Sequence, residues 1–233
     1  MVCENYTKIR ERIDAACKLS GRDPKSVTLI AVSKTKPVSM IRELMEIGVE
    51  DFGENHAQEL VAKTEEITEP LRWHFIGNLQ TNKVKYVVGR ASLIHSVNSL
   101  RLAEAISKES VKKGLVSDIL IEVNIADEAT KEGIAGDEAV SLVESASRLP
   151  GLHIIGLMAI APPVDDPEEN RPYFRSLREL AEKIGALGLE GVEMKELSMG
   201  MTNDFTCAVE EGATFVRVGT AIFGERSYPT QGR

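Results

Sequence analysis

The sequence lacks the features of several specialised protein classes. Its three cysteines, Cys3, Cys17 and Cys207, are too few and too scattered for a disulfide framework or a zinc site, and they suit a reducing compartment. No apolar run is long enough to span a membrane, and the polar first residues do not resemble a signal peptide. A net charge of −8 without a basic run argues against a nucleic-acid or anionic-membrane partner. We therefore expect a cytoplasmic protein that binds a small molecule and no metal.

Strand-like and helical segments alternate along the whole chain, without repeats or linkers. This alternation is typical of parallel α/β folds, and 233 residues fit one large domain. A doubly wound sheet is the rival fold, but neither G-x-G-x-x-G nor G-x-x-x-x-G-K-[ST] occurs. We therefore predict a single (β/α)8 TIM barrel over residues 1–233, with an extra N-terminal helix at about residues 4–20. After a first strand that begins at Val27, the other predicted strands are 49–52, 73–76, 93–97, 119–124, 152–158, 196–199 and 214–218.

A lysine stands at the end of the first predicted strand. The stretch VTLIAVSKTKP is an unbroken apolar run from Val27 that stops at Lys34, and Pro37 then suits the start of a helix. Ligands of parallel α/β folds bind at the carboxyl ends of the strands, where a partly desolvated lysine can act as an amine nucleophile. Lys34 is the candidate, although an ordinary surface lysine is the alternative. Lys36 competes with it, and we expect Lys36 to be more solvated.

The last two predicted strands end in residues that suit a phosphate. Barrels that bind phosphorylated ligands often hold the phosphate in the loops after strands seven and eight. The seventh strand exits through LSMGMTND, which offers the hydroxyl of Ser198. The eighth exits through VRVGTAIFG, where Gly219 permits close backbone approach, Thr220 adds a hydroxyl and another helix can begin. Plain turns favour the same residue types, so both interpretations stay open.

A strand-end lysine together with a phosphate site suggests a phosphorylated carbonyl compound held as a Schiff base. Pyridoxal phosphate fits this description, and so does a sugar phosphate in an aldolase. Arg217 favours pyridoxal phosphate, because it precedes Gly219 by two residues and can point into the barrel mouth, where a guanidinium can donate to a pyridine nitrogen. The alternative for Arg217 is a strand residue paired with a carboxylate.

Six blocks of sequence make the resemblance to a known family specific. They are VSKTKP, FGENHAQE, WHFIGNLQTNK, GLMAI, LSMGMTNDF and VRVGTAIFG, and they run from Val32 to Gly224. Together they resemble the pyridoxal phosphate homeostasis protein family, which binds pyridoxal 5'-phosphate in a barrel like that of alanine racemase and has no well-established enzymatic activity. The loop from Asp127 to Gly133, with Lys131, also resembles the family, without an assigned role.

The resemblance implies a role for each candidate site residue. Lys34 would form the Schiff base, Arg217 would face the pyridine nitrogen, and no residue is assigned as catalytic. The implied phosphate contacts are Ser198, Gly219 and Thr220, and the implied pocket residues near the ring are Asn55, His74 and Met158.

Several of these residues have ordinary structural alternatives. Asn55 also suits a helix N-cap, His74 also suits a core histidine, and Met158 alone would be a core residue. The other three histidines, His56, His95 and His153, look isolated and show no metal-ligand spacing.

Three functions remain open at this stage: a cofactor-binding homeostasis protein, a pyridoxal-phosphate-dependent amino-acid racemase and a Schiff-base aldolase. In alanine racemase, a C-terminal domain supplies a tyrosine for the second face of the substrate. This chain ends nine residues after Gly224, so we expect that domain to be absent. An arginine at the pyridine nitrogen also weakens the ring as an electron sink. We therefore expect a monomeric carrier without efficient turnover, with apo forms of pyridoxal-phosphate enzymes as possible recipients.

Overall fold

The computed structural model describes residues 1–126 and 133–225, and its strands form a parallel sheet that closes on itself. The strand order is β4-β3-β2-β1-β9-β8-β7-β5, and the pairing of β4 with β5 closes the barrel. The short strand β6 (Ile134–Ala135), which the sequence did not predict, pairs with β5 outside this ring. The barrel strands are β1 (Thr28–Val32), β2 (Asp51–Glu54), β3 (Arg72–Phe75), β4 (Leu93–Val97), β5 (Ser117–Asn124), β7 (Leu152–Ala159), β8 (Val192–Ser198) and β9 (Phe215–Val218). The predicted eight-stranded TIM barrel is confirmed.

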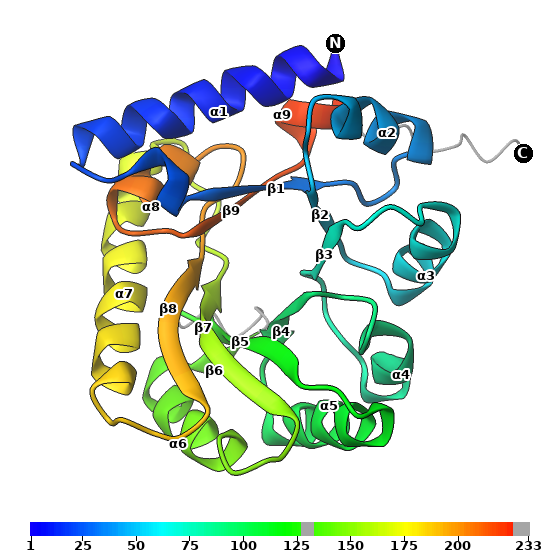
Figure 1. Cartoon of the computed structure of the whole chain (residues 1–233). Helices are drawn as coiled ribbons and strands as arrows, with labels where there is room; N and C mark the ends of the chain where they lie inside the picture. Colours follow the sequence, from blue (N-terminus) through cyan, green and yellow to red (C-terminus); the bar gives the residue numbers. More distant parts are fainter. Residues whose placement is uncertain (127–132, 226–233) are drawn as a thin grey trace, which may run out of the picture.

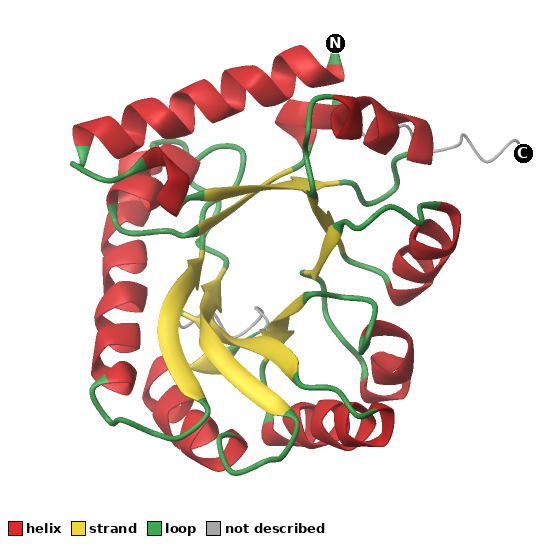
Figure 2. Ribbon diagram, viewed as in Figure 1, coloured by secondary structure: helices red, strands yellow, loops and turns green. Residues whose placement is uncertain are grey.

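The helices form a layer outside the strands (Figures 1 and 2). They are α1 (Val2–Leu19), α2 (Val38–Glu46), α3 (Ala57–Glu66), α4 (Val84–Val87), α5 (Leu100–Lys113), α6 (Gly136–Ala146), α7 (Arg171–Gly185), α8 (Phe205–Glu210) and α9 (Thr220–Phe223). Single 3-10 turns are η1 (Pro24–Ser26), η2 (Thr81–Lys83) and η3 (Pro167–Asn170). The largest displacement from prediction among the strands is in β8, which begins four residues before the predicted 196–199. Strand β2 runs two residues further than 49–52 and so includes the buried Glu54.

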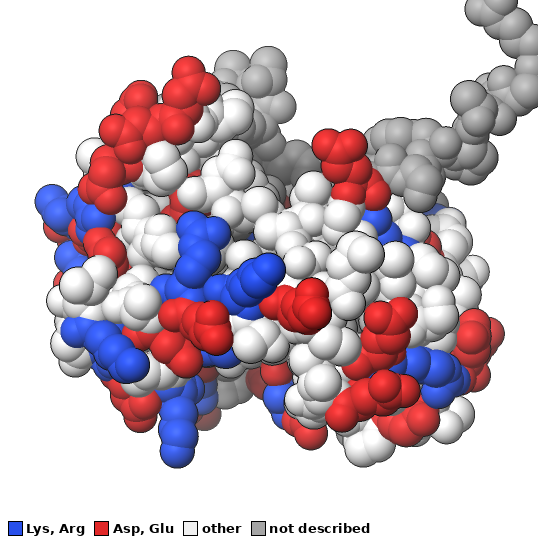
Figure 3. Space-filling view, turned by 90° about the horizontal axis from the view of Figure 1, so that it is seen from above, with Lys and Arg blue, Asp and Glu red and all other residues white. Residues whose placement is uncertain are grey.

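The N-terminal helix α1 confirms the helix expected at about residues 4–20. It buries an apolar stripe that includes Ile9, Ile13 and Cys17, and it packs against α8 and α9. Those two helices have only six and four residues, so α1 completes the outer layer beside two short ring helices (Figure 1). Seen from above, on the side where α1 lies in Figure 1, acidic and basic side chains are interspersed (Figure 3).

The inside of the barrel differs in character from its outside. Outward-facing strand residues pack with the helices in the main apolar core. The inner apolar cluster is small and consists of Leu93, Leu120, Ile155 and Met158, with Phe215 against it. The rest of the interior includes buried polar groups, which require internal hydrogen-bond partners. These partners are described with the site.

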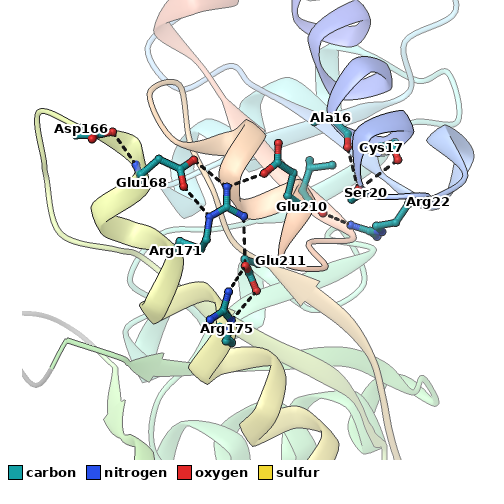
Figure 4. A network of polar contacts seen from close by, with 11 residues as sticks. Ala16, Cys17, Ser20, Arg22, Asp166, Glu168, Arg171, Arg175, Glu210 and Glu211 are labelled. Atoms are coloured by element: carbon teal, nitrogen blue, oxygen red, sulfur yellow. Dashed lines mark hydrogen bonds and ion pairs between the residues drawn. The ribbon is translucent and has the colours of Figure 1, made fainter.

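Ion pairs join α7 to the residues at the end of α8 (Figure 4). Arg171 contacts Glu168 at 2.7 Å, Glu210 at 2.6 Å and Glu211 at 3.2 Å. Arg175 contacts the same Glu211 at 2.9 Å. Arg178 approaches Glu211 at 3.6 Å, so three guanidinium groups share the neutralisation of this buried carboxylate. The network holds together the two helices that follow β7 and β8.

Replacing Arg171 with methionine should lower the free energy of unfolding by about 1 kcal/mol, because three carboxylates lose a partner while Arg175 still neutralises Glu211. Urea unfolding followed by circular dichroism measures the loss. Arg42→Met is the control, since both side chains of its ion pair with Glu69, at 3.4 Å, are about half exposed. Equal losses for the two variants would contradict a stabilising role of the network.

Candidate functional site

The turn after β1 carries Lys34 at the carboxyl end of the barrel. Ser33 is buried, Lys34 is half-buried, and Thr35 has a φ of +62°. Among the residues that the structure describes, Thr35 is the one non-glycine residue with positive φ. A threonine in this conformation costs energy, so surrounding contacts must hold it in place. One such contact is the Thr35 amide, which donates to Glu59 Oε2 at 2.7 Å.

A buried ion pair supports this turn from below. Lys63 Nζ donates to Glu54 Oε1 at 2.6 Å and to the carbonyl oxygen of Ser33 at 2.7 Å. The Ser33 hydroxyl donates to the same Glu54 oxygen at 2.5 Å. Burial raises the pKa of Glu54, against the opposing effects of the Lys63 ammonium and of the hydrogen bond from Ser33. The backbone beside Lys34 is therefore fixed by charged groups from β2 and α3.

The ammonium group of Lys36 lies against the end of α9. It donates to the carbonyl oxygens of Phe223 at 3.2 Å, Gly224 at 3.0 Å and Glu225 at 2.7 Å. The end of α9 supplies acceptors for all three ammonium protons of Lys36. Lys34 and Lys36 are both half-buried, so a more solvated Lys36 stays a prediction. Lys36 thus ties the turn after β1 to the chain after β9.

Gly219 and Thr220 lie beside this turn, because β1 and β9 are neighbours in the barrel. Ala31 is in register with Val218, so the two strands end at the same level. A Cβ atom on Gly219 would come within 3.3 Å of the Val32 carbonyl oxygen, closer than most real contacts. Helix α9 begins at Thr220 directly after β9, and the first amides of a helix have no acceptor within it. The second predicted phosphate segment therefore lies at the same mouth as Lys34.

Arg217 is buried one layer below this mouth. It is 5% exposed, and its guanidinium donates to Ser198 Oγ at 2.6 Å and to the Ala159 carbonyl oxygen at 2.9 Å. Burial lowers the pKa of Arg217 to about 10, although the carboxylates of Glu122 and Asp204 favour the charged form. Its fixed partners direct the guanidinium into the interior.

Ser198 and His74 also lie in the interior, where other side chains already use their polar atoms. The Ser198 hydroxyl contacts Arg217 and His95 Nδ1, at 2.6 and 2.8 Å, and Ser198 is fully buried. The His74 ring nitrogens contact His95 Nε2 at 3.0 Å and Asp51 Oδ1 at 3.1 Å. The structure therefore connects both residues to Arg217. The direct cofactor contacts predicted for them would compete with these bonds.

His95 is an interior polar residue whose contacts sequence reasoning missed, since it looked isolated. It lies on β4, beside His74 on β3 and across the barrel from Ser198 on β8. Leu93 and His95 are two residues apart on β4 and so share its inward face. This spacing is the one sequence signal for the position of His95. The Glu54–Lys63 pair was missed as well.

Asn55 and Met158 are the remaining predicted pocket residues. Asn55 follows β2, and its Oδ1 atom is buried without a hydrogen-bond partner among the residues described. It lines a cavity of about 260 Å³ with His56, Gln58, Asn78 and Lys83. The N-cap of α3 is His56, so the N-cap alternative for Asn55 is wrong. Met158 is buried in the inner apolar cluster and is in register with Ser198.

Other site types find little support within residues 1–126 and 133–225. No group of three or more histidine, cysteine or acidic side chains there could hold a metal ion. Cys3, Cys17 and Cys207 are free thiols. No helix in the same ranges has both the length and the apolar character for a membrane crossing. The loop that includes Lys131 lies outside the described residues, apart from Gly133.

Comparisons with known proteins give consistent results. The family model described as alanine racemase, N-terminal domain, matches residues 5–227. The chain is 45% identical over 227 residues to the pyridoxal phosphate homeostasis protein of Aquifex aeolicus, covering 97% of this chain and 99% of that protein. It is 41% identical to the protein of the same name from Pseudomonas aeruginosa, covering 97% and 96%.

Solved structures agree with these sequence matches. PipY of Synechococcus elongatus with PLP bound superposes with a TM-score of 0.81 at 37% identity, covering 93% of this chain and all of that one. Alanine racemase of Clostridium difficile superposes with a TM-score of 0.76 at 14% identity, covering 98% of this chain and 58% of that one. At that identity the second likeness concerns the barrel fold alone.

Proposed function

Because the chain belongs to the alanine racemase N-terminal domain family, among its pyridoxal phosphate homeostasis proteins, we propose that it binds pyridoxal 5'-phosphate and buffers or delivers this cofactor. The proposal covers residues 1–233 as a single domain, acting as a monomer in the cytoplasm. Its recipients are apo forms of enzymes that use pyridoxal phosphate. Three free thiols and the absence of a membrane-crossing helix in the described ranges are consistent with that location.

One observation carries the proposal: Lys34 and the Gly219–Thr220 turn end neighbouring strands, and Arg217 is buried beneath them. An amine, a glycine turn that begins a helix and a cationic donor match the aldehyde, phosphate and pyridine nitrogen of the cofactor. The buried Oδ1 atom of Asn55 also lacks a partner among the described residues, which fits a pocket that a polar ligand completes.

Each residue then has a distinct task. Lys34 supplies the amine that holds the cofactor covalently, on a turn that the Glu54–Lys63 pair keeps rigid. Gly219 and Thr220 bind the phosphate through backbone amides and a hydroxyl. Arg217, which can only donate, holds the ring nitrogen in its unprotonated state. When bound, pyridoxal phosphate supplies an aldehyde that amines attack and a ring that withdraws electrons.

The same features support a carrier that does not turn over amino acids efficiently. Arg217 would donate to the ring nitrogen and would keep a proton off it, which would weaken electron withdrawal by the ring. Racemisation also needs an acid or base on the second face of the substrate. Among the tyrosines in the described ranges, Tyr6, Tyr86 and Tyr173 lie on the outer helices α1, α4 and α7. We therefore propose binding and release as the main activity.

Two experiments test this proposal on protein loaded with pyridoxal phosphate. Mixed with an apo-enzyme, the protein should transfer the cofactor and restore the activity of that enzyme. Incubated with L-alanine and other L-amino acids in deuterated water, it should cause slow or no deuterium exchange at Cα. Formation of D-isomers at roughly one turnover per second or faster would instead identify a racemase. A protein that takes up no pyridoxal phosphate would contradict both functions.

A further inference from the structure

A chain of hydrogen bonds crosses the barrel interior and ends at Arg217. Arg217 Nη1 contacts Ser198 Oγ at 2.6 Å, and Ser198 Oγ contacts His95 Nδ1 at 2.8 Å. His95 Nε2 contacts His74 Nδ1 at 3.0 Å, and His74 Nε2 contacts Asp51 Oδ1 at 3.1 Å. Five strands contribute one residue each: β9, β8, β4, β3 and β2. The chain thus reaches from beneath the mouth to the first residue of β2, at the opposite end of that strand.

The side chains that form these hydrogen bonds are buried, so the loss of any one bond is costly. His74, His95 and Ser198 are at most 3% exposed, and the Phe215 ring lies 5.4 and 5.6 Å from the two imidazoles. A polar group without a partner in such surroundings costs about 1–3 kcal/mol. Every donor in the chain must therefore face an acceptor, so the bonds cannot be oriented independently of one another.

The two ends of the chain fix the direction of every bond between them. Arginine can only donate, so Arg217 donates to Ser198. An ionised aspartate can only accept, so His74 Nε2–H donates to Asp51. Burial would raise the pKa of Asp51, but hydrogen bonds from His74 and Arg72 outweigh burial and lower it, which keeps the carboxylate ionised.

With neutral imidazoles, the remaining protons have only one satisfactory arrangement. His74 Nδ1 is then bare and accepts from His95 Nε2–H, and His95 Nδ1 is bare and accepts from the Ser198 hydroxyl. An additional proton on His74 would move the His95 proton to Nδ1, and the buried Ser198 hydroxyl would lose its acceptor. Ser198 Oγ has no other hydrogen-bond partner among residues 1–126 and 133–225.

We propose that His74 and His95 are positioning residues for Arg217: anchored by Asp51, they orient the Ser198 hydroxyl so that its lone pair accepts from the guanidinium. The chain holds the charged arginine in one rotamer beneath the mouth. Its effect on the ring nitrogen of a bound ligand rests on the proposed function. The proton arrangement itself is a property of the protein alone.

Nitrogen-15 NMR of the histidine rings in cofactor-free protein near pH 7.5 tests the arrangement directly. We expect both His74 and His95 to be neutral, with the proton on Nε2 and a bare Nδ1. His153 serves for comparison, because it is half-buried beside Asp118 and Glu193 and takes no part in these hydrogen bonds. A proton on Nδ1 of His74 or His95, or a cationic ring in either, would overturn the proposal whether or not the protein binds pyridoxal phosphate.

Ligand affinity tests the positioning role. His95→Leu should weaken pyridoxal phosphate about tenfold, because Ser198 loses the acceptor that orients it for Arg217. It should leave the affinity for an analogue with carbon in place of the ring nitrogen nearly unchanged. His95→Asn keeps an acceptor near the position of Nδ1 and should recover part of the loss, and His153→Leu should have no effect.

A merely structural histidine would give a different pattern. In that case His95→Leu would weaken both ligands equally, and His95→Asn would bring no selective recovery for pyridoxal phosphate. Either result would overturn the positioning role. If the unsubstituted protein failed to bind pyridoxal phosphate at all, the proposed function would fail, while the NMR result would still decide the proton arrangement.

Discussion

Lys34→Ala is expected to abolish covalent capture of pyridoxal phosphate. The unsubstituted protein should turn yellow on mixing with the cofactor, and borohydride should fix the cofactor on the peptide that contains Lys34. The alanine variant should stay colourless and lose roughly a hundredfold in affinity, because only the phosphate and ring contacts remain. Absorbance spectra and peptide mass spectrometry measure both effects.

Lys36→Ala is the matched control, since it removes a lysine two residues away from the same turn. The Lys36 ammonium is occupied by three backbone carbonyls, so the variant should still carry the borohydride-fixed cofactor on Lys34. Label on Lys36 in the unsubstituted protein, or unchanged colour in Lys34→Ala, would show that the amine has been wrongly identified.

Lys63→Met should have the largest effect on stability. Lys63 and Glu54 are 7% and 0% exposed, and removing the ammonium leaves a buried carboxylate without its counter-charge. Breaking such a pair from one side costs about 3 kcal/mol or more. Because Lys63 also holds the Ser33 carbonyl, pyridoxal phosphate should bind the variant more weakly too. Urea unfolding and cofactor titration measure the two losses.

The loss in free energy of unfolding that Lys63→Met causes should grow with pH. Burial already raises the pKa of Glu54, and without Lys63 its pKa should rise further. A carboxyl group whose pKa is higher in the folded state stabilises the fold fully below its unfolded pKa, and this contribution is lost as pH rises through the folded pKa. The variant should therefore lose more stability at pH 8 than at pH 5.

Two further variants make the interpretation specific. Glu54→Leu combined with Lys63→Met removes both charges and should recover part of the stability, because no unpaired charge remains. Lys112→Met removes an exposed lysine whose contact to Glu109 is 3.6 Å, and it should be nearly neutral. A loss in Lys63→Met that is small, or the same at both pH values, would count against a buried ion pair beneath the Lys34 turn.

The sequence alone determined the barrel and the main positions of the candidate site. Strand-like segments that alternate with helical segments indicate a parallel sheet covered by helices, and about eight of them suit a closed barrel. Because parallel strands carry ligands at their carboxyl ends, Lys34 and Gly219 could be predicted to meet at one mouth, and the structure places the ends of β1 and β9 side by side. Local signals sufficed, since each depends on one strand and the turn after it.

Only the tertiary structure decided which inward side chains meet. The alternation along a strand tells which face a residue occupies, but not which residue of a distant strand it touches. From the sequence His95 therefore looked isolated, and nothing indicated that Ser198 would meet it or that Lys36 would reach the end of α9. Closing the barrel brings His95 on β4 within reach of Ser198 on β8, and brings the end of α9 to Lys36. These contacts depend on a closed ring of strands, which no short stretch of sequence can encode.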